Sequence, residues 1–176
     1  MDFFDKGDFQ ATTGATDDII VANPKIVEIL ERCFNGNEHG SNKLFEALGQ
    51  GTYLIPVMPM PIPINVGENE SGVQNLGVEF MSSNDSEGNQ YLPLCTDKSS
   101  LDVFVAGNPC NIMLLSATDV WELLCDLEDF EGVAICSDRI GRDLLLGSAS
   151  VNLIQSMHGG SQVSFKNETK KTTVVH

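Results

Sequence analysis

Apolar residues recur with helical spacing in the first part of the chain. A first helix is predicted to begin at Pro24, with Asn23 as its N-cap, and to end before Gly36. Its apolar face consists of Ile26, Ile29, Leu30 and Cys33. A second, shorter helix is predicted from Ser41 to Leu48, where Gly49 stops it. This part of the chain is therefore predicted to be helical.

The stretch from Tyr53 to Val66 combines an apolar run with four prolines. Residues i and i+2 of a strand direct their N–H groups to the same side, so Pro59, Pro61 and Pro63 remove donors from one edge. The opposite edge, which includes the N–H of Met60, keeps its donors. We therefore expect an edge strand, or the continuation of one, that pairs on one side only. The prolines also have the PxxP spacing of an SH3 ligand, but no Arg or Lys flanks them.

Two apolar segments separated by turn-forming residues come next. The segments 73–83 and 89–96 flank Asn84–Gly88, whose composition is typical of a turn, and this pattern predicts a β-hairpin. Thr96 is predicted to cap a short helix that ends at Gly107.

Strands and helices are predicted to alternate in the remainder of the chain. The expected elements are a strand at 111–115, a helix at 117–130, strands at 133–136 and 143–146, and a helix from Ser150 to Met157. Ser116 and Asp119 resemble a capping box for the longest of these helices, and Gly132 is expected to stop it. The polar residues 161–176 are predicted to form a loose tail.

Length and composition fit one domain. The chain has 176 residues, of which 41% are hydrophobic, enough for one buried core. The expected fold is α+β, with a mixed β-sheet of about five or six strands and helices packed on it. The predicted boundaries are an N-terminal extension at 1–22, the domain at 23–158 and a polar tail at 159–176.

Charge and targeting signals exclude several classes of function. The formal net charge is −15, so phosphate backbones and anionic bilayers would repel the protein, and neither nucleic acid nor a membrane is an expected partner. The first residues lack the basic start and apolar region of a signal peptide, and no apolar run is long enough to span a bilayer, which favours the cytoplasm.

The cysteines and histidines show no metal or disulfide pattern. The five cysteines are odd in number and contain no C-x-x-C, as expected for reduced core thiols. His39, His158 and His176 are too far apart in sequence to form a zinc motif. No dinucleotide or P-loop fingerprint occurs, so no cofactor is expected.

The order of motifs resembles the SseB protein N-terminal domain family of bacteria. The resemblance covers roughly residues 23–158 and rests on the strand Leu54–Val57, "LIPV", the element Leu92–Asp97, "LPLCTD", and the strand and helix "IMLLSATDVWELL". Two departures are Cys95, where the family has phenylalanine, and Cys136-Ser137, where it has Asn-Pro. The resemblance implies a small α/β module with no established catalytic residues. It therefore favours binding over catalysis.

Cys136 and Arg142 have the C-x5-R spacing of cysteine phosphatases. In such a site a thiolate attacks phosphorus, while the arginine and backbone N–H groups hold the phosphate oxygens. Against this interpretation, Asp138 and Asp143 would repel a phosphate dianion. The loop is also followed by a predicted strand rather than by a helix N-terminus. A phosphatase centred on Cys136 and Arg142 is the catalytic alternative to a structural thiol at a strand end.

Acidic residues gather around Trp121 in the predicted helix 117–130 and just beyond it. They are Glu122, Asp126, Glu128, Asp129 and Glu131. Four of them lie toward the C-terminal end of the helix, where the helix dipole disfavours negative charge. One interpretation is a surface for a basic protein, with Trp121 as its aromatic anchor. The other is a solvated acidic face with Trp121 packed on the sheet.

These patterns favour a non-enzymatic protein–protein interaction module with a basic protein partner. Its contact surface is predicted to be either the acidic residues around Trp121 or the strand edge near Met60. A related alternative is an immunity-like inhibitor whose acidic face neutralises a basic toxin. That alternative predicts tight one-to-one binding that weakens steeply with salt.

Overall fold

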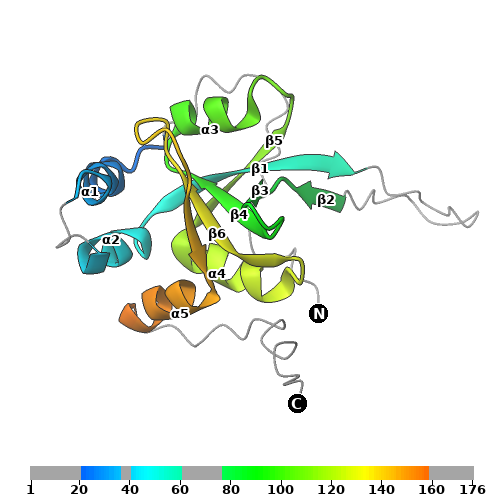
Figure 1. Ribbon diagram of the computed structural model, residues 1–176. Helices are drawn as coiled ribbons and strands as arrows, with labels where there is room; N and C mark the ends of the chain where they lie inside the picture. The colour runs from blue at the N-terminus through cyan, green and yellow to red at the C-terminus, as the bar shows by residue number, and fades with distance from the viewer. Residues whose placement is uncertain (1–20, 37–40, 61–76, 159–176) are drawn as a thin grey trace, which may run out of the picture.

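A mixed β-sheet forms the centre of the protein (Figure 1). The structure is a computed structural model, and it describes residues 21–36, 41–60 and 77–158. The described helices are α1 (Pro24–Phe34), α2 (Ser41–Leu48), α3 (Lys98–Val105), α4 (Ala117–Asp126) and α5 (Ser148–Met157). The described strands are β1 (Thr52–Met60), β2 (Gly77–Phe80), β3 (Ser83–Asn84), β4 (Gln90–Cys95), β5 (Asn111–Ser116), β6 (Phe130–Cys136) and β7 (Leu144–Gly147). The predicted α+β class is confirmed, with seven strands in the described residues where about five or six were expected.

The strands follow the order β2-β1-β4-β6-β7, with β3 beside β4 and β5 beside β1. Only β4 and β6 are parallel, and every other pair of described strands is antiparallel. The register of the parallel pair joins Cys95 to Cys136, the last residue of each strand. The carboxyl ends of β4 and β6 therefore lie side by side.

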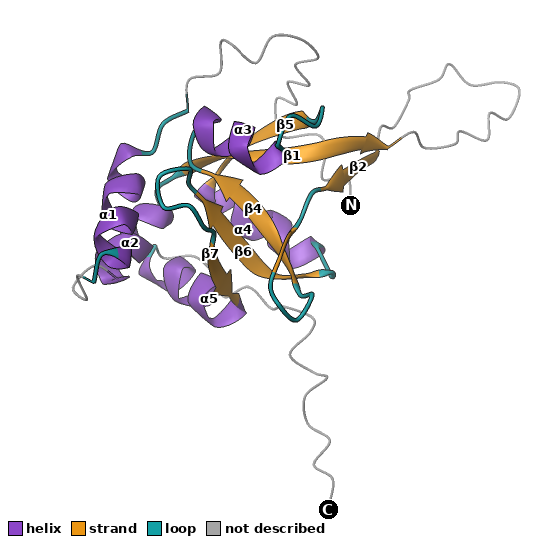
Figure 2. Ribbon diagram, turned by 45° about the horizontal axis from the view of Figure 1, so that its top comes forward, coloured by secondary structure: helices purple, strands orange, loops and turns teal. Residues whose placement is uncertain are grey.

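Alternate residues of each strand face two separate cores. On one face, Tyr53, Ile55 and Val57 of β1 pack with apolar side chains of α1, α2, α4 and α5. On the other face, Leu54 packs in a cluster with Leu101 and Val105 of α3, together with Cys95, Ala134 and Cys136. Figure 2 shows α3 and α4 on opposite sides of the sheet. Among the described helices, α3 alone contributes buried residues to the second core.

The prolines of β1 coincide with changes in its pairing. The carbonyl of Pro56 accepts a hydrogen bond from the N–H of Met81 at 3.3 Å, so alternate residues from Pro56 onward face β2. Val57 and Pro59 then face the side of β5, whose pairing ends at Val57. The backbone N–H that Pro59 lacks would therefore point to the side where no described strand pairs with this residue.

The predicted one-sided strand is confirmed for part of β1 only. Met58 to Met60 pair with β2 alone among the described strands, whereas Thr52 to Val57 pair with β5, and Leu54 and Val57 also pair on the opposite side, with β4 and β2. The donor-bearing edge near Met60 is covered by β2, so the prediction of a contact surface there is wrong. Pro61 and Pro63 lie outside the described residues.

The helix predicted at 117–130 is shorter than expected, because it ends at Asp126 and Phe130 begins β6. The capping box at its start is confirmed, since the Ser116 hydroxyl accepts from the N–H of Asp119 at 3.3 Å. Gly132 is not a helix stop but lies inside β6. A Cβ there would come within 2.0 Å of the carbonyl oxygen of Leu146, so the approach of β7 requires a glycine.

Asn23, the predicted N-cap of α1, binds other parts of the fold instead. The Asn23 side chain does not cap α1 but donates to the carbonyls of Thr52 at 2.7 Å and Thr96 at 2.8 Å. It thereby ties the start of α1 to β1 and to the end of β4.

The starts of α3 and α5 also differ from the prediction. Asp97 rather than Thr96 caps α3, because the Asp97 carboxylate accepts a hydrogen bond from the N–H of Ser100 at 2.8 Å. α5 begins at Ser148, two residues before the predicted Ser150.

The predicted hairpin is formed, but with a shorter first strand. β3 pairs with β4 around the turn Asp85–Asn89, whereas residues 77–80 leave the hairpin and pair with β1 as β2. The predicted extension up to residue 20 and the tail from residue 159 lie outside the described residues. None of the described helices is long and apolar enough to cross a membrane.

Candidate functional site

Trp121 is a core residue and not a surface anchor. Its side chain is only 4% exposed, and it packs in the main core with Val120 and Leu124 of the same helix. A partner cannot bury a side chain that the fold has already buried. The prediction of Trp121 as an aromatic anchor is therefore wrong, and the alternative, a tryptophan packed inside the fold, is confirmed.

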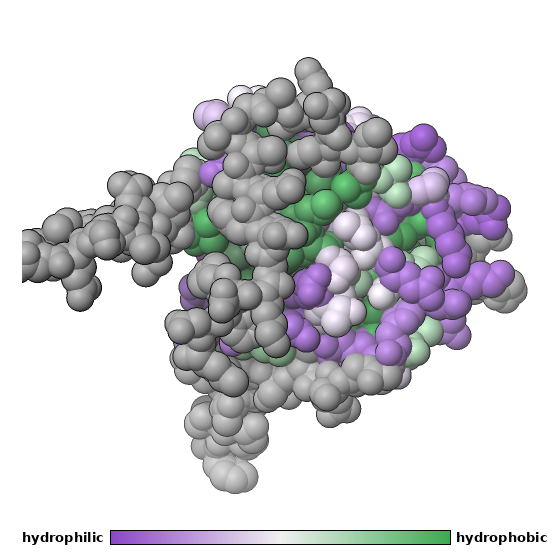
Figure 3. Space-filling view, turned by 180° about the vertical axis from the view of Figure 1, so that it is seen from behind, coloured by the Kyte–Doolittle hydropathy of each residue, from purple (hydrophilic) through white to green (hydrophobic). Residues whose placement is uncertain are grey.

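The five predicted acidic residues are all exposed, but they do not share one helix. Glu122 and Asp126 belong to α4, Glu128 and Asp129 to the turn that follows, and Glu131 to β6. Glu122, Asp126, Asp129 and Glu131 form no ion pair with a described residue. We call these five residues the acidic segment. Figure 3, which views the molecule from behind, shows that the outer surface is also hydrophilic where α1 and α2 lie.

The second candidate region lies at the other end of β6. Residues 137–143 connect Cys136, the last residue of β6, to β7, and α3 begins at the neighbouring end of β4. Thr96 holds these ends together, because its hydroxyl donates to the carbonyl of Cys136 at 3.2 Å and lies 3.0 Å from the hydroxyl of Ser100. Ligand sites of α/β proteins commonly form at the carboxyl ends of parallel strands.

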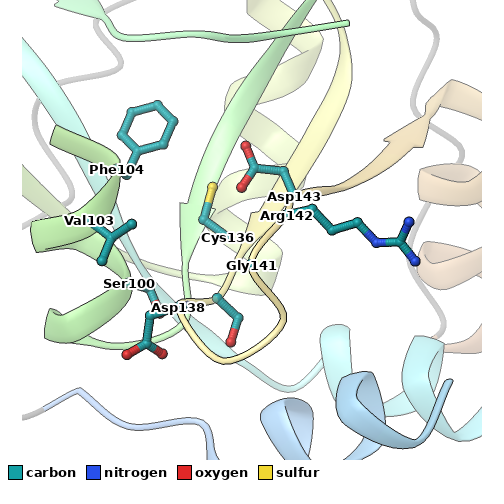
Figure 4. A pocket seen from close by; sticks show the side chains of 9 residues that line it. Ser100, Val103, Phe104, Cys136, Asp138, Gly141, Arg142 and Asp143 are labelled. Carbon is teal, nitrogen blue, oxygen red and sulfur yellow. The ribbon is translucent and has the colours of Figure 1, made fainter. Parts of the chain in front are cut away.

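A cavity of about 160 Å³ opens at this place (Figure 4). α3 supplies one wall through Ser100, Val103 and Phe104. The rest is formed by the end of β6 and the connecting residues, which are Cys136, Ser137, Asp138, Gly141, Arg142 and Asp143. The two residues of the C-x5-R motif therefore do line a common cavity.

The chemistry of Cys136 differs from that of a phosphatase nucleophile. Its side chain is 2% exposed. A hydrogen bond with Cys95, burial, and the charge and hydrogen bond of Asp143 all raise the pKa of the Cys136 thiol well above its usual range. A nucleophilic cysteine needs the opposite shift, which cationic neighbours produce. Cys136 is therefore held as a thiol.

The two arginines of the connecting residues both contact α1. Arg142 lies over the ring of Phe34 of α1, with 4.1 Å between its guanidinium carbon and the ring centroid. Arg139 pairs with Glu31 of α1 at 3.7 Å. Figure 4 shows the Arg142 side chain extending away from Cys136 and from the side chains of α3. Both cations of the loop thus contact α1, although Arg142 also belongs to the lining of the cavity.

The two aspartates of the loop are held on the other side. Asp143 accepts a hydrogen bond from the Ser83 hydroxyl at 2.7 Å, and Asp138 accepts one from the Ser99 hydroxyl at 2.5 Å. Two aspartates and Arg142 line the cavity, so carboxylates outnumber the guanidinium there. An anion such as phosphate would therefore meet more negative than positive charge.

One polar atom of this wall has no partner. The Oγ of Ser137 is buried and has no hydrogen-bond partner among the described residues, and Ser137 as a whole is only 6% exposed. Buried hydroxyls are normally paired, so this one is an exception, and because it has almost no accessible surface it does not face the open cavity. No group of three or more acidic, cysteine or histidine side chains in the described residues is placed to hold a metal ion.

Comparison with known proteins gives no relative. No protein-family model, no curated protein and no solved structure matches this chain. The resemblance to the SseB N-terminal domain family stays a prediction from the motifs.

Sequence reasoning identified Cys136 and Arg142 but missed the side chains that define the cavity. Ser100 and Phe104 were not proposed as site residues and Ser137 was noted only as a departure from the family motif, because nothing in their local pattern distinguishes them from ordinary helix and loop residues. Only the parallel pairing of β4 with β6 brings α3 beside the connecting loop. A signal was available in principle, since a cysteine followed by a hydroxyl residue occurs at the end of both the predicted segment 89–96 (Cys95-Thr96) and the predicted strand 133–136 (Cys136-Ser137).

Proposed function

We propose that this protein is a non-enzymatic module that binds a basic protein partner through its acidic segment. One observation carries the proposal, namely that Glu122, Asp126, Glu128, Asp129 and Glu131 are all exposed within ten residues of sequence. A surface of one charge attracts a partner of the opposite charge and directs its approach. The net charge of −15 adds a long-range attraction of the same sign.

The position of the segment supports this proposal. Asp126 ends α4, and Glu128 and Asp129 follow in the turn, where the helix dipole disfavours negative charge. Negative charge at this end of a helix does not stabilise the helix. A role in binding explains their position, because a cationic partner removes the repulsion among them.

The properties of Cys136 and Arg142 favour a non-enzymatic role. The thiol pKa is raised, the guanidinium contacts Phe34, and two carboxylates line the cavity. A phosphatase loop requires a thiolate, an arginine directed at the substrate and a positive cradle. An aryl phosphate assay with the wild type and Cys136→Ser tests this directly, and turnover that Cys136→Ser abolishes would contradict the proposal.

Affinity capture from the native host with a matched pair of variants tests the binding surface. The first variant carries Glu122→Gln, Asp126→Asn and Asp129→Asn. The control removes the same charge from exposed residues elsewhere, through Glu46→Gln, Glu79→Gln and Glu87→Gln. We expect a stoichiometric basic protein with the wild type and the control, and its loss with the first variant. Equal capture by both variants, or no partner at all, would overturn the proposal.

A further inference from the structure

We propose that Cys95 and Cys136 form a reversible disulfide between β4 and β6 when the protein reacts with a peroxide. The two residues end the parallel strands, and all five cysteines of the chain are free in this structure. The inference does not depend on the acidic segment, because it concerns the opposite end of β6. It rests on the register of the strands, the shared face of the two side chains and the contact between the thiols.

The pairing of the strands brings the two cysteines to the separation that a disulfide requires. Cys95 and Cys136 are direct partners in the register of β4 and β6. Neighbouring strands lie about 4.8 Å apart, and the Cα atoms of most disulfides are about 4.4–6.8 Å apart. Both side chains belong to the apolar cluster that α3 covers, so they point to the same face of the sheet. The fold therefore places the two sulfurs within reach of each other.

The two thiols are in contact, and the strand ends are held together beside them. A hydrogen bond with Cys95 is the largest cause of the raised pKa of Cys136. Immediately beyond the pair, the backbone N–H and the hydroxyl of Thr96 both donate to the carbonyl of Cys136, each at 3.2 Å. These bonds keep the two cysteines aligned at the point where the parallel pairing ends.

The other three cysteines lack such a partner. Cys110 packs against the same cluster as Cys95 and is partly exposed, but it lies just before β5, which pairs with β1 and not with β4. No strand register therefore fixes its separation from Cys95. Cys33 and Cys125 pack against the main core on the other face. Cys95 and Cys136 are thus the only two cysteines that are direct partners in the described strands.

Hydrogen peroxide can join the two sulfurs without another reactant. The Cys136 thiolate attacks one peroxide oxygen, so an S–O bond forms, the O–O bond breaks, and the leaving hydroxide takes up the thiol proton to become water. The Cys95 thiol then attacks the sulfenic sulfur of Cys136. The S–S bond forms, the S–O bond breaks, and the second oxygen leaves as water. The two thiols lose two electrons in total, and the peroxide gains them.

The surroundings make this reaction slow and its product easy to reduce. Cys136 is 2% exposed but belongs to the lining of the cavity beside α3, whose volume of about 160 Å³ has room for peroxide. Its raised pKa keeps the thiol protonated at neutral pH, so the first step requires sustained oxidation. The Cβ atoms of a disulfide are only about 3.8 Å apart, less than the spacing of two strands, so the bond is strained. Strained disulfides are the readily reduced ones.

Peptide mapping after oxidation identifies the bond. The full-length protein is treated with hydrogen peroxide, its remaining thiols are blocked with N-ethylmaleimide in guanidinium chloride, and it is digested with trypsin and a glutamyl endopeptidase. These cleavages place the five cysteines on separate peptides, with Cys95 in residues 88–98 and Cys136 in residues 132–139. We expect these two peptides to be joined in a chain that stays monomeric in a non-reducing gel. Dithiothreitol should release them.

Single replacements provide the matched comparison. Cys95→Ala should abolish the cross-link, because it removes one of the two sulfurs. Cys125→Ala is the control, since it removes a partly exposed thiol of α4 and should leave the yield of the cross-link unchanged. If Cys95→Ala fails to fold, the peptide map of the wild type decides the question, because it assigns the bond without a variant.

Three results would overturn the proposal. The first is that residues 88–98 and 132–139 stay unjoined after the partly exposed thiols of Cys33 and Cys125 have been oxidised. The second is a bond from Cys95 to Cys110 in place of Cys136. The third is an equal yield of cross-linked chain in Cys95→Ala and Cys125→Ala.

Discussion

At the amino end of β6, Glu128, Asp129 and Glu131 are exposed on a turn and a strand, whereas Asp138 and Asp143 at its carboxyl end line a cavity. Both ends carry acidic residues, but only at the carboxyl end do these residues line a described cavity. There, the arginines contact α1, the aspartates accept hydrogen bonds from serines, and one hydroxyl has no partner among the described residues. The first is suited to a surface contact, whereas the charges of the second are engaged in contacts within the fold. The difference comes from the parallel pair β4–β6, which places α3 beside the connecting loop.

The largest expected effect concerns Trp121, which the structure places in the core and not on the surface of the acidic segment. Trp121→Ala should lower the free energy of unfolding by about 3–5 kcal/mol, because it empties a core position that is 4% exposed. Urea unfolding measures this change. Val103→Ala is the control, since that side chain is 65% exposed and should change stability by less than about 0.5 kcal/mol. A loss of partner binding without a loss of stability in Trp121→Ala would contradict the account.

The buried thiol at the carboxyl end of β6 should make stability depend on alkaline pH. The folded state raises the pKa of Cys136, so above about pH 8.5 the unfolded state releases a proton that the folded state keeps. The free energy of unfolding should therefore fall as pH rises, by about 1.4 kcal/mol per pH unit for this group.

Burial of Tyr53 raises the pKa of its phenol and acts in the same direction at higher pH. Chemical unfolding between pH 7 and 10 measures the slope. Cys136→Ala should have a shallower slope than the wild type from about pH 8.5 upward. Parallel curves for the two proteins would show that Cys136 ionises equally in both states.

Removal of the unpaired hydroxyl should stabilise the free protein. Ser137→Ala eliminates a buried group that has lost its hydration without gaining a partner in the described residues, which should raise the free energy of unfolding by about 1 kcal/mol. Thermal unfolding without ligand measures the gain. Ser100→Ala is the contrasting variant, because its hydroxyl is bonded to Asp97 at 2.7 Å and its loss should be destabilising. A destabilised Ser137→Ala would mean that the hydroxyl is satisfied in solution.

The smallest expected effect concerns the acidic segment and the helix that precedes it. Asp126→Asn should stabilise the protein by about 0.3–1 kcal/mol, because it removes a negative charge from the C-terminal end of α4. Asp119→Asn, at the other end of the same helix, should destabilise it through the loss of the capping-box charge. Denaturant titration of both variants gives the two signs, and the same sign for both would contradict the dipole argument.

Local patterns in the sequence were sufficient to predict most elements of the fold. The capping box at Ser116, the helices α1 and α2 and the strand β5 follow from caps, glycines and periodicity within a few residues. Predictions that depended on distant partners were wrong. Gly132 was interpreted as a helix stop, because the closeness of Leu146 is not visible from its neighbours. Asn23 was interpreted as a cap for the same reason, since its partners are 29 and 73 residues away.

The candidate site was predictable only in outline. The spacing of Cys136 and Arg142 drew attention to the correct loop, and Asp138 and Asp143 already argued against an anion there. The direction of each side chain was not predictable, because it is set by Phe34 and Glu31 of α1 and by Ser83 and Ser99 elsewhere in the chain. The exposure of the acidic segment agreed with its polarity, whereas the burial of Trp121 depended on how α4 packs.

The most direct test of the proposed function is the salt dependence of affinity for the captured partner. The dissociation constant is measured at two or more salt concentrations for the wild type, the variant of Glu122, Asp126 and Asp129, and the control of Glu46, Glu79 and Glu87. The account predicts a steep weakening with salt for the wild type and the control, and weaker binding with a shallower dependence for the variant. Equal affinities and equal salt dependence in all three proteins would contradict it.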